Sequence, residues 1–372
     1  MSNCNLEFNG KAGINFMRSD NPNSNNKALY NRVYQNAMLN WPRGNNGFAE
    51  AGGGWSGGLV FSSSLNGVAR GNLVYGNGGE GMISYGSAPG IQTGGTLFEK
   101  NVSMDNWSAN MYFDNQANDT ARQNMLFFSG YDTSSWLKKP SAGYPWDTLY
   151  KMNSGISIGD ECSSSGNCSA NLANIKIYNN LIVGFRLGVA EYAEGKLRNP
   201  HGLKNTLIAN NTIILPPTTP PNTYTAGIFL RNNGSANHGS LIVNNIVVAF
   251  DRTEPVIWYE GVGPDPGVSI ERNAYYNQES KRALWNGFLI VRKYDIKQWQ
   301  QHARCDLDSF FTNPEFVDLK NLMQGSKNIY DYRDAGLMKD SPLLGTGQSL
   351  NKKFNSNLEG MPRGKKWNIG AI

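Results

Sequence analysis

The sequence predicts an all-β solenoid, in which a short unit of strands and corners repeats along the chain and each copy stacks on the previous one. Three observations predict it. Asparagine recurs before short apolar runs at intervals of roughly 23 to 41 residues, with one of about 56, which is the range of a repeating structural unit. Most copies contain a second apolar run that opens with glycine or another small residue. Charged residues make up only 17% of the 372 residues and there are 42 glycines, as expected for a turn-rich β protein.

The first recurring feature is an asparagine at the point where the chain turns into a strand. Asparagine tolerates the left-handed backbone that such a corner needs. Its amide can also donate to one neighbouring copy and accept from the other, so stacked asparagines would satisfy one another. The motif has eight clear copies, and Asn5-Leu-Glu-Phe is a candidate for one copy before them. These eight copies are Asn31-Arg-Val-Tyr, Asn72-Leu-Val-Tyr, Asn101-Val-Ser-Met, Asn124-Met-Leu-Phe, Asn180-Leu-Ile-Val, Asn211-Thr-Ile-Ile, Asn245-Ile-Val-Val and Asn273-Ala-Tyr-Tyr.

The second recurring feature is a strand with alternating apolar residues, which indicates one buried face. It occurs at Gly13-Ile-Asn-Phe, Gly58-Leu-Val-Phe, Gly81-Met-Ile-Ser, Asn110-Met-Tyr-Phe, Gly155-Ile-Ser-Ile, Gly188-Val-Ala-Glu, Gly227-Ile-Phe-Leu and Pro255-Val-Ile-Trp. Over roughly residues 5–277 this pattern resembles the right-handed parallel β-helix superfamily, the pectate-lyase-like fold. The resemblance implies a right-handed parallel β-helix of about eight or nine coils, and it specifies the fold better than the function.

Three insertions interrupt the coils, and a separate short loop carries two cysteines. Residues 37–57, 128–154 and 215–226 all leave between the asparagine strand and the glycine strand, so we expect them to project from one edge of the solenoid. Cys162 and Cys168 enclose a short polar loop that could close as a disulfide, which would indicate an oxidising, exported setting.

The repeat gives way to a different pattern after residue 277. We therefore divide the chain into coils over residues 1–277 and a C-terminal cap over residues 278–372. One short amphipathic helix is expected after Asp295, a plausible N-cap. The chain ends in Trp367-Asn-Ile-Gly-Ala-Ile, after a Ser-Pro and a Met-Pro-Arg motif, and this ending resembles the closing segment of bacterial secreted β-helix proteins of polysaccharide metabolism. We expect the cap to cover the open end of the solenoid.

The register of the glycine strands predicts which residues face solvent. With the first apolar residue of each run pointing inward, the next residue and the one two beyond it point outward. The Gly188 copy breaks this pattern, and we expect a bulge there that turns Glu191 or Tyr192 outward. One edge would then carry acids on successive coils about 4.8 Å apart. The side chains predicted along it are Tyr85, Asp114, Asp160, Glu161, Glu191 and Arg231.

Several functions are compatible with this row of side chains. Ca²⁺, the one cofactor expected, could bind Asp114, Asp160 and Glu161 and acidify a uronate for β-elimination. Arg231 would be the base, with Lys151 and Arg186 as substitutes. Catalytic roles then fall to Asp114, Asp160, Glu191 and Arg231. Two carboxylates on neighbouring coils could alternatively hydrolyse a glycosidic bond. The third hypothesis is a non-catalytic rod that binds a glycan or acts as an adhesin. A lyase acting on an acidic polysaccharide is our leading prediction.

Exposed aromatic rings and the overall charge point to the partner. Flat rings with few charges suit the stacking of sugars, and those predicted to bind substrate are Tyr85, Tyr112, Trp136, Trp146, Phe229 and Trp258. The net charge is only +5 and there is no Lys/Arg run, so the sequence does not indicate a nucleic-acid-binding surface. No apolar run approaches the roughly 20 residues of a membrane span. We expect a secreted or cell-surface protein, with an export signal or further coils upstream of Met1.

Overall fold

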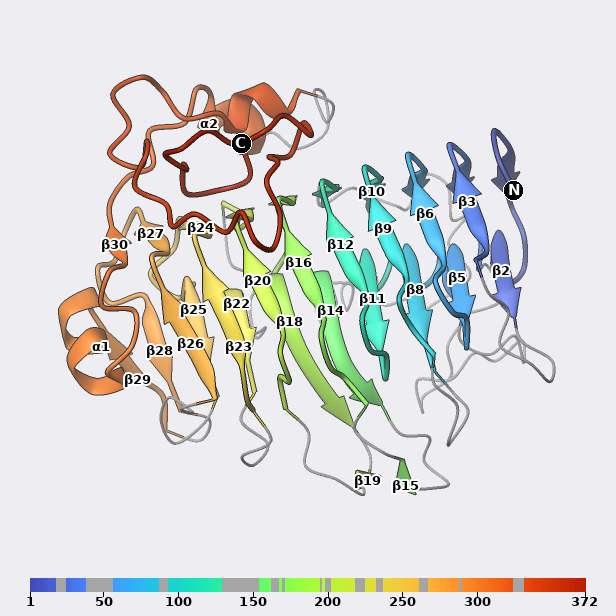
Figure 1. Ribbon diagram of the computed structural model, residues 1–372, viewed down its shortest axis with the longest axis horizontal. Coiled ribbons are helices and arrows are strands. Elements are labelled where there is room, and N and C mark those ends of the chain that lie inside the picture. Colours follow the sequence, from blue (N-terminus) through green and yellow to red (C-terminus); the bar gives the residue numbers. More distant parts are fainter. Residues whose placement is uncertain are drawn as a thin grey trace, which may run out of the picture.

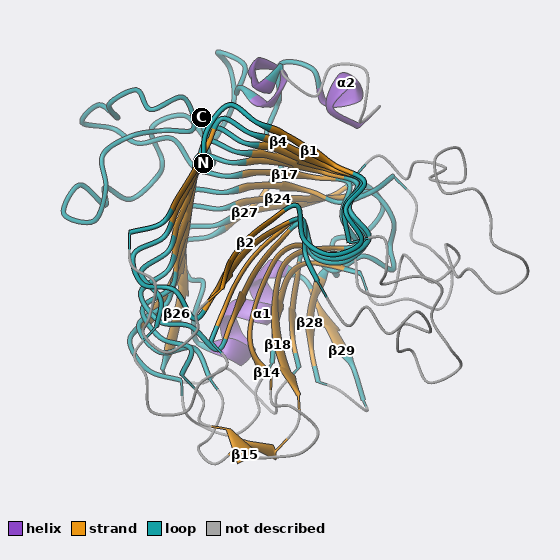
Figure 2. Cartoon of the chain, turned by 90° about the vertical axis from the view of Figure 1, so that its right-hand side faces the viewer, coloured by secondary structure: helices purple, strands orange, loops and turns teal. Residues whose placement is uncertain are grey.

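A computed structural model describes residues 1–17, 25–37, 56–86, 93–128, 154–161, 167–168, 171–194, 196–197, 202–217, 225–231, 237–260, 267–287, 290–323 and 331–372. The chain coils around one long axis, and three parallel sheets form the sides of the coil (Figures 1 and 2). This confirms the predicted right-handed parallel β-helix. None of the described helices is long and apolar enough to cross a membrane.

Each of the first eight coils gives one strand to each sheet. The asparagine sheet contains β1 (Asn5–Glu7), β4 (Arg32–Tyr34), β7 (Leu73–Tyr75), β10 (Val102–Met104), β13 (Met125–Phe127), β17 (Leu181–Val183), β21 (Thr212–Ile214), β24 (Ile246–Ala249), β27 (Ala274–Asn277) and β30 (Phe310–Phe311). The glycine sheet contains β2 (Ile14–Met17), β5 (Leu59–Ser62), β8 (Met82–Tyr85), β11 (Met111–Asp114), β14 (Ser154–Glu161), β18 (Leu187–Glu194), β22 (Ala226–Leu230), β25 (Ile257–Tyr259), β28 (Leu284–Asn286) and β29 (Arg292–Tyr294).

The third sheet contains β3 (Lys27–Leu29), β6 (Val68–Arg70), β9 (Leu97–Glu99), β12 (Thr120–Arg122), β16 (Lys176–Tyr178), β20 (Leu207–Ala209), β23 (Ser240–Val243) and β26 (Val268–Glu271). A small separate pair is formed by β15 (Asn167–Cys168) and β19 (Lys196–Leu197). Among the strands that the structure describes, every pair is parallel except β28 with β29. The middle residue of each third-sheet strand is buried, because it faces the shared core.

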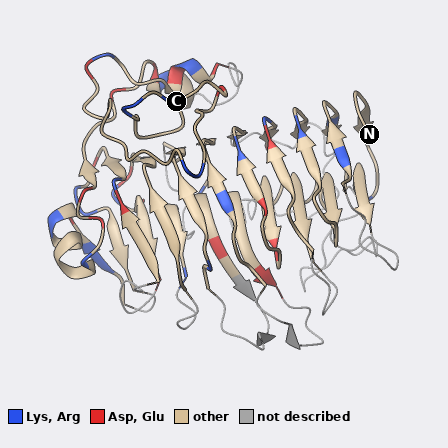
Figure 3. Cartoon of the chain, in the orientation of Figure 1, with Lys and Arg blue, Asp and Glu red and all other residues tan. Residues whose placement is uncertain are grey.

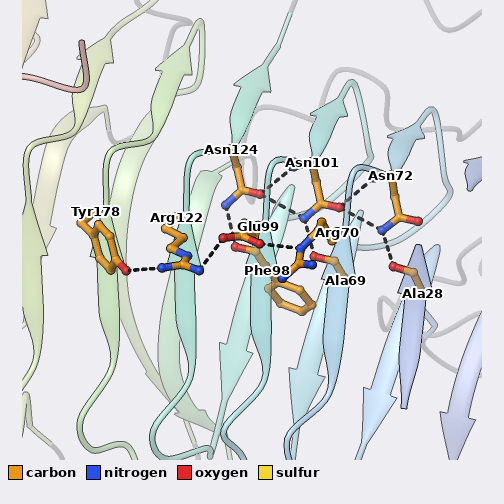
Figure 4. Close-up of polar contacts among 10 residues, drawn as sticks. All are labelled: Ala28, Ala69, Arg70, Asn72, Phe98, Glu99, Asn101, Arg122, Asn124 and Tyr178. Carbon is orange, nitrogen blue, oxygen red and sulfur yellow. Dashed lines mark hydrogen bonds and ion pairs between the residues drawn. The ribbon is translucent and has the colours of Figure 1, made fainter. Parts of the chain in front are cut away.

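The predicted asparagine column exists as a continuous hydrogen-bonded ladder. From Asn31 to Asn273, each side-chain amide nitrogen donates to the Oδ1 of the next asparagine at 2.9–3.0 Å. Asn101, for example, donates both its backbone N–H and its side-chain nitrogen to Asn124, and the side-chain nitrogen also donates to the carbonyl of Ala69 (Figure 4). The ladder therefore satisfies donors and acceptors that are almost wholly buried.

The backbone conformation at this corner differs from the prediction. The ladder asparagines are not left-handed; the residue directly before each of them is, with φ between +50° and +66°. These residues are Tyr30, Gly71, Lys100, Gln123, Asn179, Asn210, Asn244 and Arg272. In the first coil the ladder position is held by Cys4, whose N–H donates to Asn31, because Asn5 pairs with Arg32 instead. Asn5 is therefore not the earlier ladder copy.

A second asparagine ladder, which we did not predict, runs along the other end of the same strands. Asn9 donates to Asn36, Asn36 to Asn77 and Asn77 to Asn106, at 2.7–3.1 Å between nitrogen and Oδ1. Asn106 then donates to Asn110 within its own coil. The signal was present in the sequence, since each of the first three links joins asparagines spaced like those of the first ladder.

The C-terminal region covers more than the end of the solenoid. The helix α1 (Ile296–Ala303) forms as predicted, with Asp295 as its N-cap, and lies across one end of the coil (Figure 2). Buried Trp299 on α1 and Tyr275 of the last full coil both donate to Asp306. However, β28 and β30 still extend the glycine and asparagine sheets, so coil-like pairing continues past the predicted boundary at residue 277.

The final segment lies along the flank of the solenoid instead of at its end (Figure 1). It includes α2 (Leu319–Met323) and a 3₁₀ turn (Tyr332–Ala335). Its apolar residues pack on the outer faces of β13, β17, β21, β24 and β27 and of β16, β20 and β23. Arg363 secures it by donating to the Oδ1 of Asn179 at 2.8 Å, and Phe354 stacks on Tyr178 with ring centroids 4.2 Å apart.

Candidate functional site

The predicted inward and outward rows of the glycine sheet are largely confirmed. The residues predicted to point inward are buried at 0–4% exposure and pair with one another from coil to coil. The outer face is also largely covered, because Val60, Ile83 and Tyr112 form a small apolar cluster there with partly buried Tyr85 and Tyr192. Tyr85 pairs with Asp114 and Tyr192 pairs with Gly159, so the cluster reaches the ends of β11 and β14, where Figure 3 shows acidic residues.

Asp114 and Glu161 lie together at this outer edge. Asp114, the last residue of β11, is only 9% exposed, and its Oδ1 accepts the backbone N–H of Glu161 at 3.0 Å. Glu161, the last residue of β14, lies in the outward register of Ser157 and Gly159 and is half-buried. The strand neighbours of Asp114 are Tyr85 on one side and Gly159 on the other. Two carboxylates thus lie in one site that is partly shielded from solvent.

The electrostatics of the site follow from this burial. Burial raises the pKa of Asp114 well above its usual range, and the nearby charge of Glu161 raises it further, while the N–H donated by Glu161 opposes the rise. Burial, followed by the charges of Asp114 and Glu161, also raises the pKa of the Tyr112 hydroxyl. Asp114 therefore holds a proton to a higher pH than an exposed aspartate does.

Two of the predicted acids face the opposite side of the sheet. Asp160 is fully buried, and its Oδ1 accepts the backbone N–H groups of Asn171 and Leu172 at 2.9 and 3.0 Å, so it stabilises the next corner. Glu191 pairs with Ile158 of the inward row, is 2% exposed and accepts the N–H of Arg231 at 2.8 Å. The pairing of β14 with β18 runs without a break from Ile156 to Glu161. The expected bulge is therefore absent there, and Tyr192 faces outward by register alone.

Arg231 lies away from the acid pair. Its Nε donates to Glu260 at 2.8 Å, and the two side chains are 26% and 11% exposed. It follows β22, which is three strands from β11, a separation of about 14 Å at the usual strand spacing. The structure therefore brings together Tyr85, Tyr112, Asp114 and Glu161 of the predicted row, and separates Asp160, Glu191 and Arg231 from them.

The other predicted aromatic residues form a second outer cluster. Phe229 contacts Trp258 edge to face at 5.3 Å between ring centroids, and Trp258 contacts Trp285, which the sequence analysis did not select, at 5.7 Å. Trp258 is 4% exposed and donates its indole N–H to the carbonyl of Gly287, so it packs the sheet surface and its ring is not open to a ligand. Trp136, Trp146 and Cys162 lie outside the described residues, as does most of each of the three predicted insertions.

The predicted calcium ligands do not converge. Asp160 faces the core while Asp114 and Glu161 face outward, and the described residues contain no group of three or more His, Cys, Asp or Glu side chains that could hold a metal ion. The prediction of Ca²⁺ thus gains no support from the ligand geometry.

A separate charged network on the third sheet is structural. Glu99 bridges Arg70 and Arg122, each at 2.5 Å, and Arg122 donates to the hydroxyl of Tyr178 at 3.2 Å (Figure 4). Glu99 is 6% exposed, so two cations offset the cost of burying one carboxylate. Since Tyr178 stacks under Phe354, the network continues into the flanking C-terminal segment.

Comparisons with known proteins find likeness in fold. No protein-family model matches the chain, and no curated protein sequence does. Among solved structures, a complex of XylC with xylose matches at 10% identity and a TM-score of 0.42, covering 92% of this chain and 49% of that one. The Dettilon tailspike protein matches at 11% identity and a TM-score of 0.41, covering 84% and 60%.

A mutant tailspike protein of E. coli bacteriophage HK620 in complex with a pentasaccharide matches at 12% identity and a TM-score of 0.44, covering 77% of this chain and 51% of that one. This chain thus spans about half to three-fifths of the length of these structures. At such identities and TM-scores, these matches carry no argument about the function of this chain.

Proposed function

We propose that the protein is a glycoside hydrolase whose site lies on the outer face of the glycine sheet, with Asp114 as the general acid and Glu161 as its ionised partner. The observation that carries the proposal is the shared burial of these two carboxylates on neighbouring strands. Glycosidases commonly use a pair of carboxyl groups whose environments push their pKa values apart, so that one is protonated while the other is charged.

The two carboxyl groups have different roles in the proposed reaction. The Asp114 carboxyl donates its proton to the glycosidic oxygen as the bond from that oxygen to the anomeric carbon breaks. The charge of Glu161 stabilises the positive charge that develops on the sugar, and the carboxylate either attacks the anomeric carbon or removes a proton from the attacking water. Tyr85 and Tyr192, both half-buried beside the pair, offer rings against which a sugar can stack.

β-Elimination remains a prediction with less support. It requires a base beside the acids, whereas Arg231 is ion-paired with Glu260 and lies three strands from β11. Secretion also remains a prediction.

The test is turnover of a panel of neutral, amino and acidic polysaccharides, measured as new reducing ends. Asp114→Asn and Glu161→Gln should each lower kcat by roughly 10²- to 10⁴-fold, the usual contribution of an acid or base. Glu271→Gln on β26 of the third sheet is the matched control and should leave kcat unchanged. Products with unsaturated uronate absorbance would instead establish elimination, and binding without turnover would indicate a glycan-binding rod.

A further inference from the structure

One buried arginine has no partner for its charge. Arg186 lies at the corner between β17 and β18 and is only 5% exposed. Burial lowers the pKa of its guanidinium to about 10, and no charge on a described residue contributes to the shift, so the group stays positive at neutral pH. Within the described structure its side chain takes part in no ion pair and no hydrogen bond, and its Nε is fully buried.

Other arginines that are partly buried show how this chain normally satisfies a guanidinium. Burial also lowers the pKa of Arg363 to about 10, but its guanidinium donates to four backbone carbonyls and to the Oδ1 of Asn179. Arg231 pairs with Glu260. Arg186 is more buried than either arginine and has no such acceptors, although an unpaired charge is costly to bury.

A second buried polar side chain without a partner lies beside Arg186 on the next coil. Leu187 pairs with Ala226, whose N–H donates to the carbonyl of Arg186 at 2.9 Å, so Thr225 is level with Arg186. Thr225 is 2% exposed, and its hydroxyl has no hydrogen-bond partner. Residues that are level on adjacent parallel strands face the same side. The corner therefore holds a cation and a hydroxyl that are both unsatisfied, and such groups call for a ligand or water.

The buried acid on the following coil is bound elsewhere. Glu254 is level with Thr225 and fully buried, and its Oε2 accepts the backbone N–H groups of Phe250 and Asp251 at 3.1 and 3.3 Å. It is not among the groups that shift the pKa of Arg186. Of the three Arg186 nitrogens, none of which has a partner in the described structure, only Nε is fully buried. The two terminal nitrogens therefore still reach solvent.

We propose that Arg186 and Thr225 bind a single oxyanion, either a free ion such as sulfate or the carboxylate of an acidic sugar. The oxyanion accepts hydrogen bonds from the terminal guanidinium nitrogens and from the threonine hydroxyl. A guanidinium matches two oxygens of such a group with parallel hydrogen bonds, and the hydroxyl adds a third donor. The bound charge offsets the cost of burying the arginine.

This site is separate from the proposed reaction centre. Tyr192 is level with Asp114 and comes six residues after Arg186, so the two sites lie about 20 Å apart along the strands. Arg186 is therefore too distant to be the substitute base for the acids, and Lys151, the other substitute, lies outside the described residues. The inference does not depend on hydrolysis at the acid pair.

Calorimetric titration with three probes tests the site. The probes are sodium sulfate, a galacturonate trimer and a galactose trimer, which has similar rings without the carboxylates. Sulfate, the galacturonate trimer or both should bind with a stoichiometry of one, and the galactose trimer should bind at least about tenfold more weakly. Tighter binding of the galacturonate trimer than of sulfate would support the site with a glycan as the source of the anion. Tighter binding of sulfate would support it with a free ion as the source.

Three variants locate the binding. Arg186→Met removes the charge and keeps the length of the side chain, and it should weaken binding by about 10- to 100-fold. Thr225→Val removes only the hydroxyl and should weaken binding by about three- to tenfold. The control is Arg252→Met, at an exposed arginine, which should leave binding unchanged and so exclude general attraction to a protein of net charge +5.

Thermal melting separates a ligand site from a structural role. Without added sulfate or galacturonate, Arg186→Met should melt at the same temperature as the wild-type protein or higher, because the variant no longer buries an unpaired charge. A lower melting temperature would show that the guanidinium stabilises the fold through the chain itself, and it would overturn the inference. Failure of both anionic probes to bind would also overturn it, as would binding that survives Arg186→Met.

Discussion

The asparagine ladder and the acidic site show what stacking does to two kinds of polar side chain. In both regions, polar side chains from adjacent strands lie close together and shielded from solvent. An amide both donates and accepts, so each ladder asparagine satisfies the next, as Asn101 does with Asn124. An ionised carboxylate only accepts, so burial, and then the charge of Glu161, leave Asp114 with a raised pKa. The same geometry that stabilises the ladder therefore destabilises the ionised acid pair, and this cost is what marks the pair as a functional candidate.

Breaking the ladder should have the largest effect on stability. Asn101→Ala removes the acceptor of two donors on Asn72. It also removes the side-chain donor to the carbonyl of Ala69 and one of the two donors to the Oδ1 of Asn124, which keeps only the backbone N–H of residue 101. We expect the free energy of unfolding to fall by about 3–5 kcal/mol, because each buried group left unsatisfied costs about 1–3 kcal/mol.

Urea denaturation measures this loss. The control is Asn15→Ala on β2, an exposed asparagine, which should change the free energy of unfolding by less than about 0.5 kcal/mol. A loss for Asn101→Ala no larger than that of the control would show that the ladder is not a stabilising element.

The acid pair should respond in the opposite direction. Asp114→Asn keeps the shape of the protonated acid and removes a buried charge, so stability at pH 8 should rise by about 0.5–2 kcal/mol even as turnover is lost. Thermal melting and reducing-end assays on one preparation measure both. A variant that is inactive and also less stable would mean that the ionised Asp114 is a structural acceptor for Glu161 and not a strained catalytic acid.

Another buried carboxyl, that of Asp119, makes stability depend on pH. Burial raises the pKa of Asp119 to about 7, although the N–H of Thr96 donates to it at 2.7 Å. Its contribution to stability is complete below about pH 4, where both states are protonated, and is lost as pH rises to about 7, because the unfolded state ionises first.

We expect this loss to amount to about 2–4 kcal/mol between pH 4 and 8. Asp119→Asn should remove most of it, as measured by urea denaturation at several pH values. An identical pH profile in the variant and the wild-type protein would assign the loss to other groups.

The smallest effect is expected at Arg231. Arg231→Ala breaks a partly exposed ion pair with Glu260, which is worth about 0.5–1 kcal/mol, and should change kcat by less than about tenfold. Complete loss of turnover would restore Arg231 as the base of an elimination reaction, and it would move the reactive centre away from Asp114.

The sequence by itself determined the solenoid, the superposition of the asparagines, the inward row of the glycine sheet and the helix capped by Asp295. Each of these depends on local patterns that every copy repeats, so period and chain order are sufficient to predict them. Asp114, Tyr85 and Tyr112 were identified as site residues for the same reason, since they lie in regular register.

Only the tertiary structure decided where exceptions to the repeat are placed. Asp160 and Glu161 are adjacent in sequence, yet one stabilises a buried corner and the other joins Asp114, because successive residues of a strand face opposite sides. The C-terminal segment lies along the flank because it buries apolar residues on the outer faces of two sheets. Its contacts join residues that are about 100 to 200 positions apart in the sequence. Local patterns carry no information about partners that distant, since such pairs become neighbours only after the coils have stacked.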